Sequence, residues 1–290
     1  MDRRSFFSKT SVLTTIFGVP IIASSYGCKS NVKNEIIINV RDYGAVGNGK
    51  SDDTIPFQQA LDQQGIIFIP NGNYLCNMLW MKSNTRLIGE SKHKTILKFK
   101  ERPEDNEGGV LNINGEIDNY LEDIIVENIT FDGNRDELYK DSYSHNIEAL
   151  ELTYVRDFVL RNIHGKNAIA DGIDIDACED FIVEGCSAEN CGKYGLHITR
   201  EQHPGNIQCY RGVVRDCRFW NNGTILEERG GGMDVIHSEN IIVDSCIAYN
   251  NYRGFVFYPG IAKPNKNVIG KLISYDNYDE DIMRDVIKSF

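Results

Sequence analysis

The sequence has little positive charge and no apolar run long enough to cross a membrane. Its 290 residues carry 31 lysines and arginines against 42 acids, a net charge of −11. Such a balance argues against nucleic acid as a partner, whereas an acidic polysaccharide remains compatible if a metal or a local basic patch meets it. The apolar run that ends at Ala23 is too short and polar-flanked for a transmembrane helix. The chain is long enough to bury one large core.

A paired cysteine motif is also missing. The chain has eight cysteines, and setting Cys28 aside leaves an odd number with no CxxC pair. A complete disulfide framework is therefore the less favoured interpretation, although an exported chain permits disulfides.

The N-terminus has the features of a targeting segment. Arg3 and Arg4 open the run "RRSFF", which resembles a twin-arginine signal, and "YGC" ending at Cys28 resembles a lipobox. We expect a signal peptide over residues 1–27, lipidation of Cys28 and a short tether over 28–35. This predicts an exported bacterial lipoprotein, periplasmic or at the cell surface, with the lipid as its membrane contact. A plain secretory signal with an incidental cysteine is the alternative.

An irregular repeat occupies the rest of the chain. Aligned apolar strands place one column at Ile129, Ile163, Cys186, Cys217, Cys246 and Leu272. From Ile163 onward the spacings are 23, 31, 29 and 26 residues, which indicates short coils with loops of varying length. The pattern predicts a β-solenoid over residues 36–290, because each coil buries its strands only by stacking on its neighbours.

Two interior features follow from this alignment. The three cysteines of the column are expected to stack inside as small apolar residues. An amide ladder is expected at a turn, through Asn167, Asn190, Asn221 and Asn250.

The N-terminal end of the solenoid needs a cover, because an open sheet edge pairs readily with other chains. The segment "SDDTIPFQQALDQ" (Ser51 to Gln63) predicts an amphipathic helix there. The longer run "INVRDYGAVGNGKSDDTIPFQQAL" (Ile38 to Leu61) resembles the opening of the pectate-lyase-like superfamily. That resemblance implies an all-β fold, a single-stranded right-handed parallel β-helix with an N-terminal capping helix.

A second strand type places polar residues in outward columns. Its segments are "ALELT", "GIDID", "GLHIT", "GMDVI" and "GFVFY". Alternation turns the apolar residues inward, so one outward column reads Glu151, Asp174, His197, Asp234 and Val256. The four polar members of this column are called the acidic stripe below. Asp176 and Tyr258 belong to the column beside it, and Asp171, Tyr194 and Arg253 precede it. We interpret the stripe as a site along an open groove; a solvated sheet face is the alternative.

Two families resemble this region in part. "NITFDGNRD" and "DGIDIDACEDFIVEGCSAENCGKYGLHI" are similar to the catalytic module of mannuronan C5-epimerases. Of that family's Tyr-Gly-Phe-Asp-Pro-His motif, Gly172 and Asp174 agree, whereas Asp171 and Asp176 replace the tyrosine and the histidine. "ADGIDI" resembles a polygalacturonase signature, of whose acids Asp171 alone remains.

These features predict an enzyme that acts on a polysaccharide, with a uronate-containing polymer expected. Removal of the C5 proton by a lyase or epimerase needs a neutralised carboxylate, a base and an acid. Expected catalytic residues are Asp174, His197, Asp176, Asp171 and Asp234, with His197 as the base and Tyr194 or Tyr258 as the acid. Expected substrate contacts are Glu151, Tyr194, Arg200, Tyr258 and Arg253. Ca²⁺ is a possible cofactor, held by Glu151, Asp174 and Asp234.

Two other functions stay open at this point. An inverting glycoside hydrolase needs two carboxyl groups about 6.5–9.5 Å apart. Asp174 and Asp234, two rungs apart in the stripe, come near that separation. A glycan-binding β-helix without catalysis is the other alternative.

Overall fold

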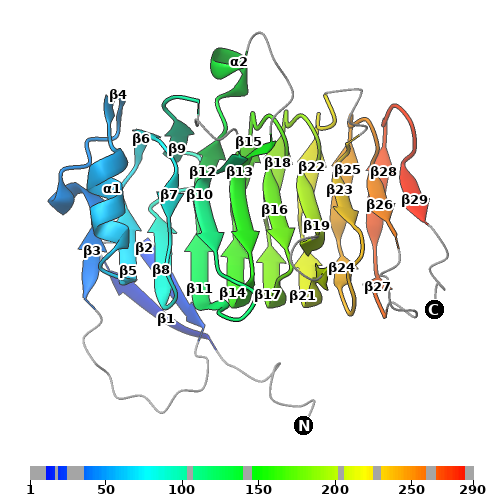
Figure 1. The fold of residues 1–290 in the computed structure, drawn as a ribbon, viewed down its shortest axis with the longest axis horizontal. Coiled ribbons are helices and arrows are strands. Elements are labelled where there is room, and N and C mark those ends of the chain that lie inside the picture. Colours follow the sequence, from blue (N-terminus) through cyan, green and yellow to red (C-terminus); the bar gives the residue numbers. More distant parts are fainter. Residues whose placement is uncertain are drawn as a thin grey trace. The chain divides into compact units, whose positions relative to one another are not determined.

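Three parallel sheets enclose one apolar core in the unit that begins at Ile37 (Figure 1). The computed structural model describes residues 11–16, 19–24, 36–102, 107–139, 146–201, 206–224, 230–258 and 266–284. In each sheet, hydrogen-bonded neighbours come from successive coils of the chain. This is the arrangement of a parallel β-helix, and it confirms the fold class predicted from the repeat.

The sheet that carries the predicted site is called the β16 sheet. Its strands are β7 (Leu79–Trp80), β10 (Glu107–Asn114), β13 (Asn146–Thr153), β16 (Ile173–Asp176), β19 (Leu196–Glu201), β23 (Met233–Val235), β26 (Phe255–Phe257) and β29 (Ile282–Arg284). The short strand β20 (Ile207–Gln208) pairs antiparallel with β19.

The other two sheets are named in the same way, the β17 sheet and the β18 sheet. The β17 sheet contains β3 (Ile37–Asn39), β5 (Gly65–Ile69), β8 (Thr85–Gly89), β11 (Leu121–Glu127), β14 (Val155–Arg161), β17 (Glu179–Glu184), β21 (Tyr210–Arg215), β24 (Ile242–Asp244) and β27 (Val268–Ile269). The β18 sheet contains β4 (Asn48–Asp52), β6 (Gly72–Cys76), β9 (Thr95–Phe99), β12 (Thr130–Asp132), β15 (His164–Lys166), β18 (Ser187–Glu189), β22 (Arg218–Trp220), β25 (Cys246–Tyr249) and β28 (Leu272–Tyr275).

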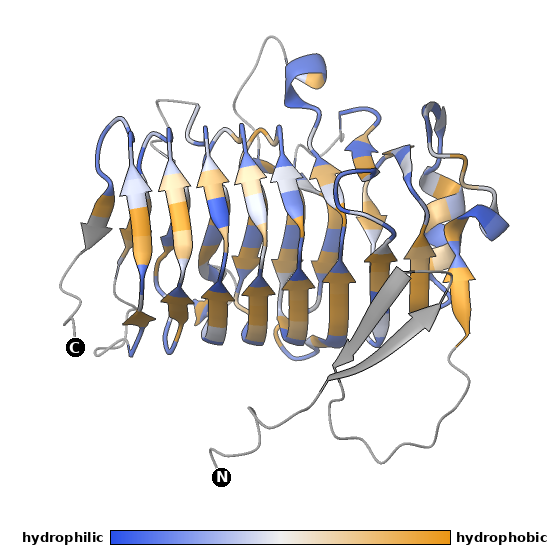
Figure 2. Cartoon of the chain, turned by 180° about the vertical axis from the view of Figure 1, so that it is seen from behind, coloured by the Kyte–Doolittle hydropathy of each residue, from blue (hydrophilic) through white to orange (hydrophobic). Residues whose placement is uncertain are grey.

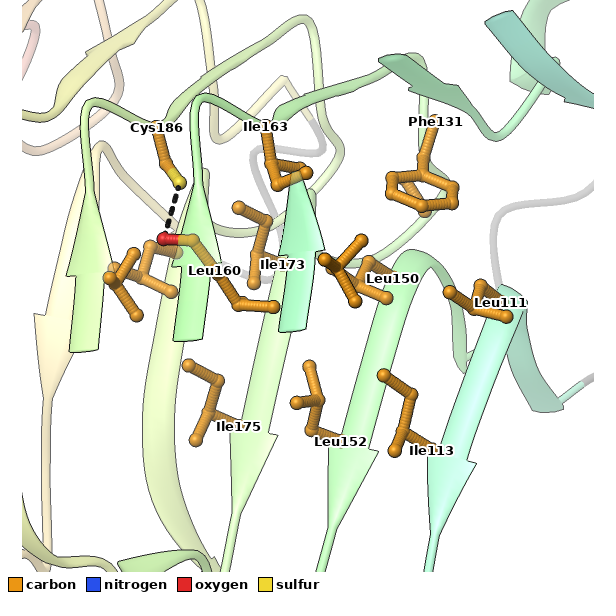
Figure 3. Close-up of a cluster of buried hydrophobic side chains, with 14 of the residues drawn as sticks. Leu111, Ile113, Phe131, Leu150, Leu152, Leu160, Ile163, Ile173, Ile175 and Cys186 are labelled. Carbon is orange, nitrogen blue, oxygen red and sulfur yellow. Dashed lines mark hydrogen bonds between the residues drawn. The ribbon is translucent and has the colours of Figure 1, made fainter. Parts of the chain in front are cut away.

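The core consists of side chains that occupy the same level on successive strands. Figure 3 shows two such rows of buried side chains, one formed by Leu111, Leu150 and Ile173 and the other by Ile113, Leu152 and Ile175. Hydrophobic segments recur from strand to strand along the stack (Figure 2). Because burial of an aliphatic side chain contributes about 1.5–3 kcal/mol, each added coil is stabilised mainly by contacts with its neighbours.

The predicted cysteine stack is confirmed. Cys186, Cys217 and Cys246 are buried and free, as are the other cysteines among the described residues. The thiol of Cys186 donates to the carbonyl oxygen of Leu160 at 3.5 Å (Figure 3). The disulfide alternative is therefore wrong for these residues.

The predicted amide ladder is correct only in part. All four asparagines adopt the left-handed conformation, with φ between 51° and 54°, and Asn190 donates to Asn167 at 2.7 Å. Asn221 and Asn250, however, are exposed. The buried ladder there runs one residue later, through Asn222, Asn251 and Asn277. A left-handed residue turns the chain, so the next side chain is the one directed inward.

Helix α1 (Thr54–Leu61) forms where the sequence predicts it, near the N-terminal coils (Figure 1). Phe57, Ala60 and Leu61 are buried, whereas Ile55, expected on the apolar face, is 70% exposed. The function of α1 as a cover stays a prediction. A 3-10 helix, η1 (Val40–Tyr43), precedes it, and a short helix, α2 (Arg135–Leu138), follows β12.

A first compact unit comprises Met1–Ile36. Its described residues form two antiparallel strands, β1 (Ser11–Ile16) and β2 (Val19–Ser24). Cys28 and the tether lie outside the described residues, so the signal, the lipid and the membrane anchor stay predictions. Within the described part of the chain, no helix is long and apolar enough to cross a membrane.

Candidate functional site

The acidic stripe forms on the β16 sheet in the predicted register. Glu151 pairs with Asp174, Asp174 with His197, and His197 with Asp234, each on the next parallel strand. Val256 follows Asp234 and closes the polar part of the column. Alternation explains the arrangement, because the flanking apolar residues of these strands are directed into the core.

The stripe is more buried than an open groove would be. Asp174 is 8% exposed and Asp234 1%, and two acids beside the stripe, Glu148 and Asp171, are 2% and 5% exposed. The burial of Asp174 and Asp234 therefore argues against the alternative of a solvated sheet face, and the predicted open groove needs correction at these two residues. Charged carboxylates in such a place need protons, a cation or hydrogen bonds to compensate the lost hydration.

His197 is fixed by contacts on two sides. Its Nδ1 lies 2.6 Å from Oδ1 of Asp234, and its ring stacks on Tyr194 with centroids 5.5 Å apart and planes 15° apart. Burial alone would lower the pKa of His197, but the carboxylates of Asp234, Asp171 and Asp174 raise this pKa well above its usual value. The imidazole is thus held as a cation at neutral pH.

Asp174 carries the most unusual carboxyl group of the stripe. Its Oδ1 has no hydrogen-bond partner among the described residues. Burial and the neighbouring Asp176 raise the pKa of Asp174 well above its usual value, against the effect of His197. Burial and Asp174 likewise raise the pKa of Glu148. In its ionised form, a carboxylate with a raised pKa is a stronger base than an ordinary aspartate, and the vacant oxygen can accept the proton.

The predicted calcium ligands are not arranged around one point. Glu151 and Asp234 are three rungs apart in the register, about 14 Å at the spacing of neighbouring strands. A single Ca²⁺ binds oxygens at about 2.3–2.6 Å, so these two residues cannot share one ion. Asp174, Asp176 and His197 instead offer ligand atoms that all lie within 4.8 Å of one another.

The remaining predicted residues divide into two groups. Tyr194 stacks on His197, and its backbone N–H donates to Asp171 at 2.6 Å, so both belong to the site. Glu151 accepts from Asn114 at 3.0 Å, while Arg253 forms an ion pair with Asp279 at 3.1 Å.

Arg200 and Tyr258 lie on the same sheet region, on β19 and directly after β26, and both are partly exposed. No contact joins either of them to Asp174 or His197 among those described. Sequence analysis did not count Glu148 among the site residues. The available signal was its aligned position, because Glu148 precedes the stripe on one coil as Asp171 does on the next.

Comparisons with solved structures first show which known proteins share the fold of this chain. The A-module of mannuronan C-5 epimerase AlgE4 from Azotobacter vinelandii superposes with a TM-score of 0.59 at 18% identity, covering 85% of this chain and 73% of the module. The surface adhesin PfbA of Streptococcus pneumoniae gives a TM-score of 0.62 at 16% identity, covering 77% and 59%. At these identities the superpositions show the fold alone.

The family follows from the sequence. The model described as "Rhamnogalacturonase A/epimerase, pectate lyase-like" matches residues 37–256, and the chain belongs to that family. The preneck appendage protein of Bacillus phage PZA is 26% identical over 224 residues, 70% of this chain and 26% of its own length. Mannuronan C5-epimerase AlgE1 of Azotobacter vinelandii is 24% identical over 255 residues, 73% of this chain and 17% of its own.

Alginate lyase 7 of Azotobacter vinelandii is 24% identical over 205 residues, 57% of this chain and 24% of its own. The chain therefore spans about a quarter or less of the length of these three relatives. An epimerase, a lyase and a phage appendage protein thus all match this chain in sequence.

Proposed function

We propose that this protein modifies a uronate-containing polysaccharide by removing the C5 proton, as an epimerase or a lyase. The observation that carries the proposal is the contact set of the stripe: a buried carboxylate with a vacant oxygen next to a histidine held as a cation. The relatives named as a mannuronan C5-epimerase and an alginate lyase support the same chemistry.

The geometry supports one assignment of the three required roles. The imidazolium of His197, fixed by Asp234, supplies positive charge to the substrate carboxylate. Asp174 accepts the C5 proton through its vacant oxygen. Tyr194 is the acid, because burial and the carboxylates of Asp234 and Asp171 raise its pKa and keep the phenol protonated. This assignment revises the prediction that His197 is the base, since a protonated imidazole has no lone pair to accept a proton.

The first experiment is an activity screen on polyuronides. Incubation with polymannuronate, alginate and polygalacturonate should produce either absorbance near 230 nm, which indicates β-elimination, or a changed ratio of C5 epimers in the proton NMR spectrum. New reducing ends without that absorbance would replace the proposal with a hydrolase, in which Asp174 and Asp234 would be about 9.6 Å apart across two rungs. No change on any polymer would contradict the proposal.

A bound cation is a second source of the positive charge. Asp174, Asp176 and a neutral His197 would fit such an ion, because their ligand atoms converge and Asp174 has a vacant oxygen; the ion and the imidazolium are therefore alternatives. The ion, Ca²⁺ in the sequence-based prediction, would neutralise the uronate carboxylate. Treatment with EDTA distinguishes the two sources: activity that persists favours the imidazolium, and activity that is lost and restored by Ca²⁺ favours the ion.

A binding protein without catalysis is the competing proposal. The similarity to a phage appendage protein and the structural likeness to an adhesin favour it. Calorimetry with the same polymers would detect binding, and binding without any product would decide for this alternative. In either case we propose the polysaccharide as the partner of an exported, lipid-anchored protein.

A further inference from the structure

A serine, a histidine and a glutamate lie together on a different sheet from the stripe. His164 begins β15, and Ser187 and Glu189 are the first and last residues of β18, which pairs with β15 in parallel. In this register His164 is directly opposite Ser187. Glu189 is two residues along the same strand and therefore on the same face of the β18 sheet.

The three side chains are joined by two contacts through one imidazole. Nδ1 of His164 lies 2.9 Å from Oγ of Ser187, and Nε2 lies 3.3 Å from Oε1 of Glu189. The tautomer with its proton on Nε2 donates to the carboxylate and leaves the Nδ1 lone pair for the serine hydroxyl. A nucleophile within reach of a base that a third group orients is the arrangement of nucleophilic catalysis.

The surroundings keep the imidazole in place and neutral. The ring of His164 stacks on Trp220, with centroids 5.6 Å apart and planes 16° apart. Burial lowers the pKa of His164, and the cations Lys92 and Lys166 lower it further, against the effect of Glu189. Ser187 is 8% exposed, the side chain of His164 12% and that of Glu189 35%, so the cluster is most open on the glutamate side.

A cation is available for the negative charge of an acyl-transfer intermediate. Arg218 is directly opposite Ser187 on the next strand, β22, and is exposed. Lys166 is engaged by Asp132 at 3.3 Å, whereas Arg218 extends from the same row as the serine. A charged donor beside the nucleophile is what stabilises an oxyanion.

We propose that Ser187, His164 and Glu189 form a second catalytic site, which hydrolyses esters of small acyl groups. Oγ of Ser187 attacks the ester carbonyl while His164 takes the hydroxyl proton. The carbon–oxygen bond to the alcohol breaks, and His164 returns the proton to the leaving alkoxide. Water then attacks the acyl carbonyl while His164 takes one of its protons. The bond between the acyl group and Oγ breaks, His164 returns the proton to Oγ, and the acyl group leaves as a carboxylic acid. Glu189 is a positioning residue that fixes the tautomer.

The first test is covalent labelling of the whole chain with a fluorophosphonate. Mass spectrometry should find one adduct, on the peptide that contains Ser187, and no adduct in Ser187→Ala or His164→Gln. Ser245→Ala is the matched control, because the Ser245 hydroxyl donates to Asp244 rather than to a histidine; this variant should label like the parent. An unlabelled Ser187 in the folded parent would overturn the proposal.

The second test follows the hydrolysis of p-nitrophenyl acetate. Ser187→Ala and His164→Gln should lose about 100-fold or more in rate, at an unchanged melting temperature. Glu189→Gln should lower kcat with KM unchanged, and Glu189→Asp should restore part of it. Equal rates in the parent and in Ser187→Ala would reject the site. Activity on polyuronides should be the same in all these variants, so this proposal and the function proposed for the stripe fail independently.

Discussion

Asp174 is buried beside other acids and has a vacant oxygen. Its replacement should therefore lower activity and raise stability. In Asp174→Asn the proton acceptor is lost, so turnover on an active polyuronide should fall by a factor of about 10² to 10⁴. The neutral amide also relieves repulsion with Asp176, so the variant should unfold at a higher temperature than the parent.

The gain in stability depends on pH with a defined sign. Because the folded state raises the pKa of Asp174, its contribution to stability is present at low pH and is lost as the pH rises through the raised pKa. The melting temperatures of parent and Asp174→Asn should therefore converge near pH 4 and separate at pH 8, measured in EDTA. Asp118→Asn, at an exposed position, is the control and should shift stability by no more than about 0.5 kcal/mol. A variant that melts lower than the parent at pH 8 would contradict this account.

His197 should act on stability in the same direction. Its pKa is raised in the folded state, so its ion pair with Asp234 stabilises fully below the unfolded pKa, about 6.5. This contribution is lost as the pH rises through the raised folded pKa. The stability advantage of the parent over His197→Gln should thus be largest near pH 6 and shrink toward alkaline pH, in chemical unfolding across that range. An advantage that grows with pH would show that the imidazole is buried in its neutral form.

At the scale of elements, the prediction concerns the buried amide ladder, whose hydrogen bonds join successive coils. Asn251 accepts from the backbone and side chain of Asn222 and donates to Phe219 and Asn277. Asn251→Ala leaves buried polar groups unpaired, at about 1–3 kcal/mol each. We expect urea unfolding to show a loss of about 2–4 kcal/mol. Asn250→Gly is the control, because glycine accepts the left-handed conformation of this exposed position, and an equal loss there would refute the ladder's importance.

Sequence analysis predicted the strands of the β16 sheet better than the burial of the side chains that they carry. The columns through Asp174 and His197 followed from strict alternation, which leaves a strand only one way to bury its isoleucines. Burial of Asp234 was not predictable, because periodicity does not specify side-chain contacts between coils, such as that of the His197 imidazole with Asp234. The amide ladder was misplaced by one residue at Asn221 and Asn250, since the alignment did not show that the asparagine after each left-handed residue is the one directed inward. The role we propose for His197 differs from the predicted one because the carboxylates that raise its pKa are brought together only by the fold.

At the scale of the whole molecule, the prediction concerns the N-terminal segment and attachment to a membrane. We predict that Cys28 carries lipid and holds the protein at a membrane, with more than one acyl chain needed for stable attachment. In cell fractionation, the parent should remain with membranes and Cys28→Ser should move to the soluble fraction. Mass spectrometry of the parent should show a mature chain that begins at Cys28. Retention of Cys28→Ser in membranes to the same extent would dismiss the lipid anchor.

The stacking of coils also has a kinetic consequence. Strand pairing joins each coil only to the coils before and after it, so structure can grow from any nucleus along one dimension. Unfolding should then advance as a front from a frayed end rather than as one concerted event. The column of buried thiols marks positions along that front: Cys246 lies nearer the C-terminal coils than Cys186, and a front from that end exposes it first. The order in which these buried thiols become exposed would thus report the order in which the coils open.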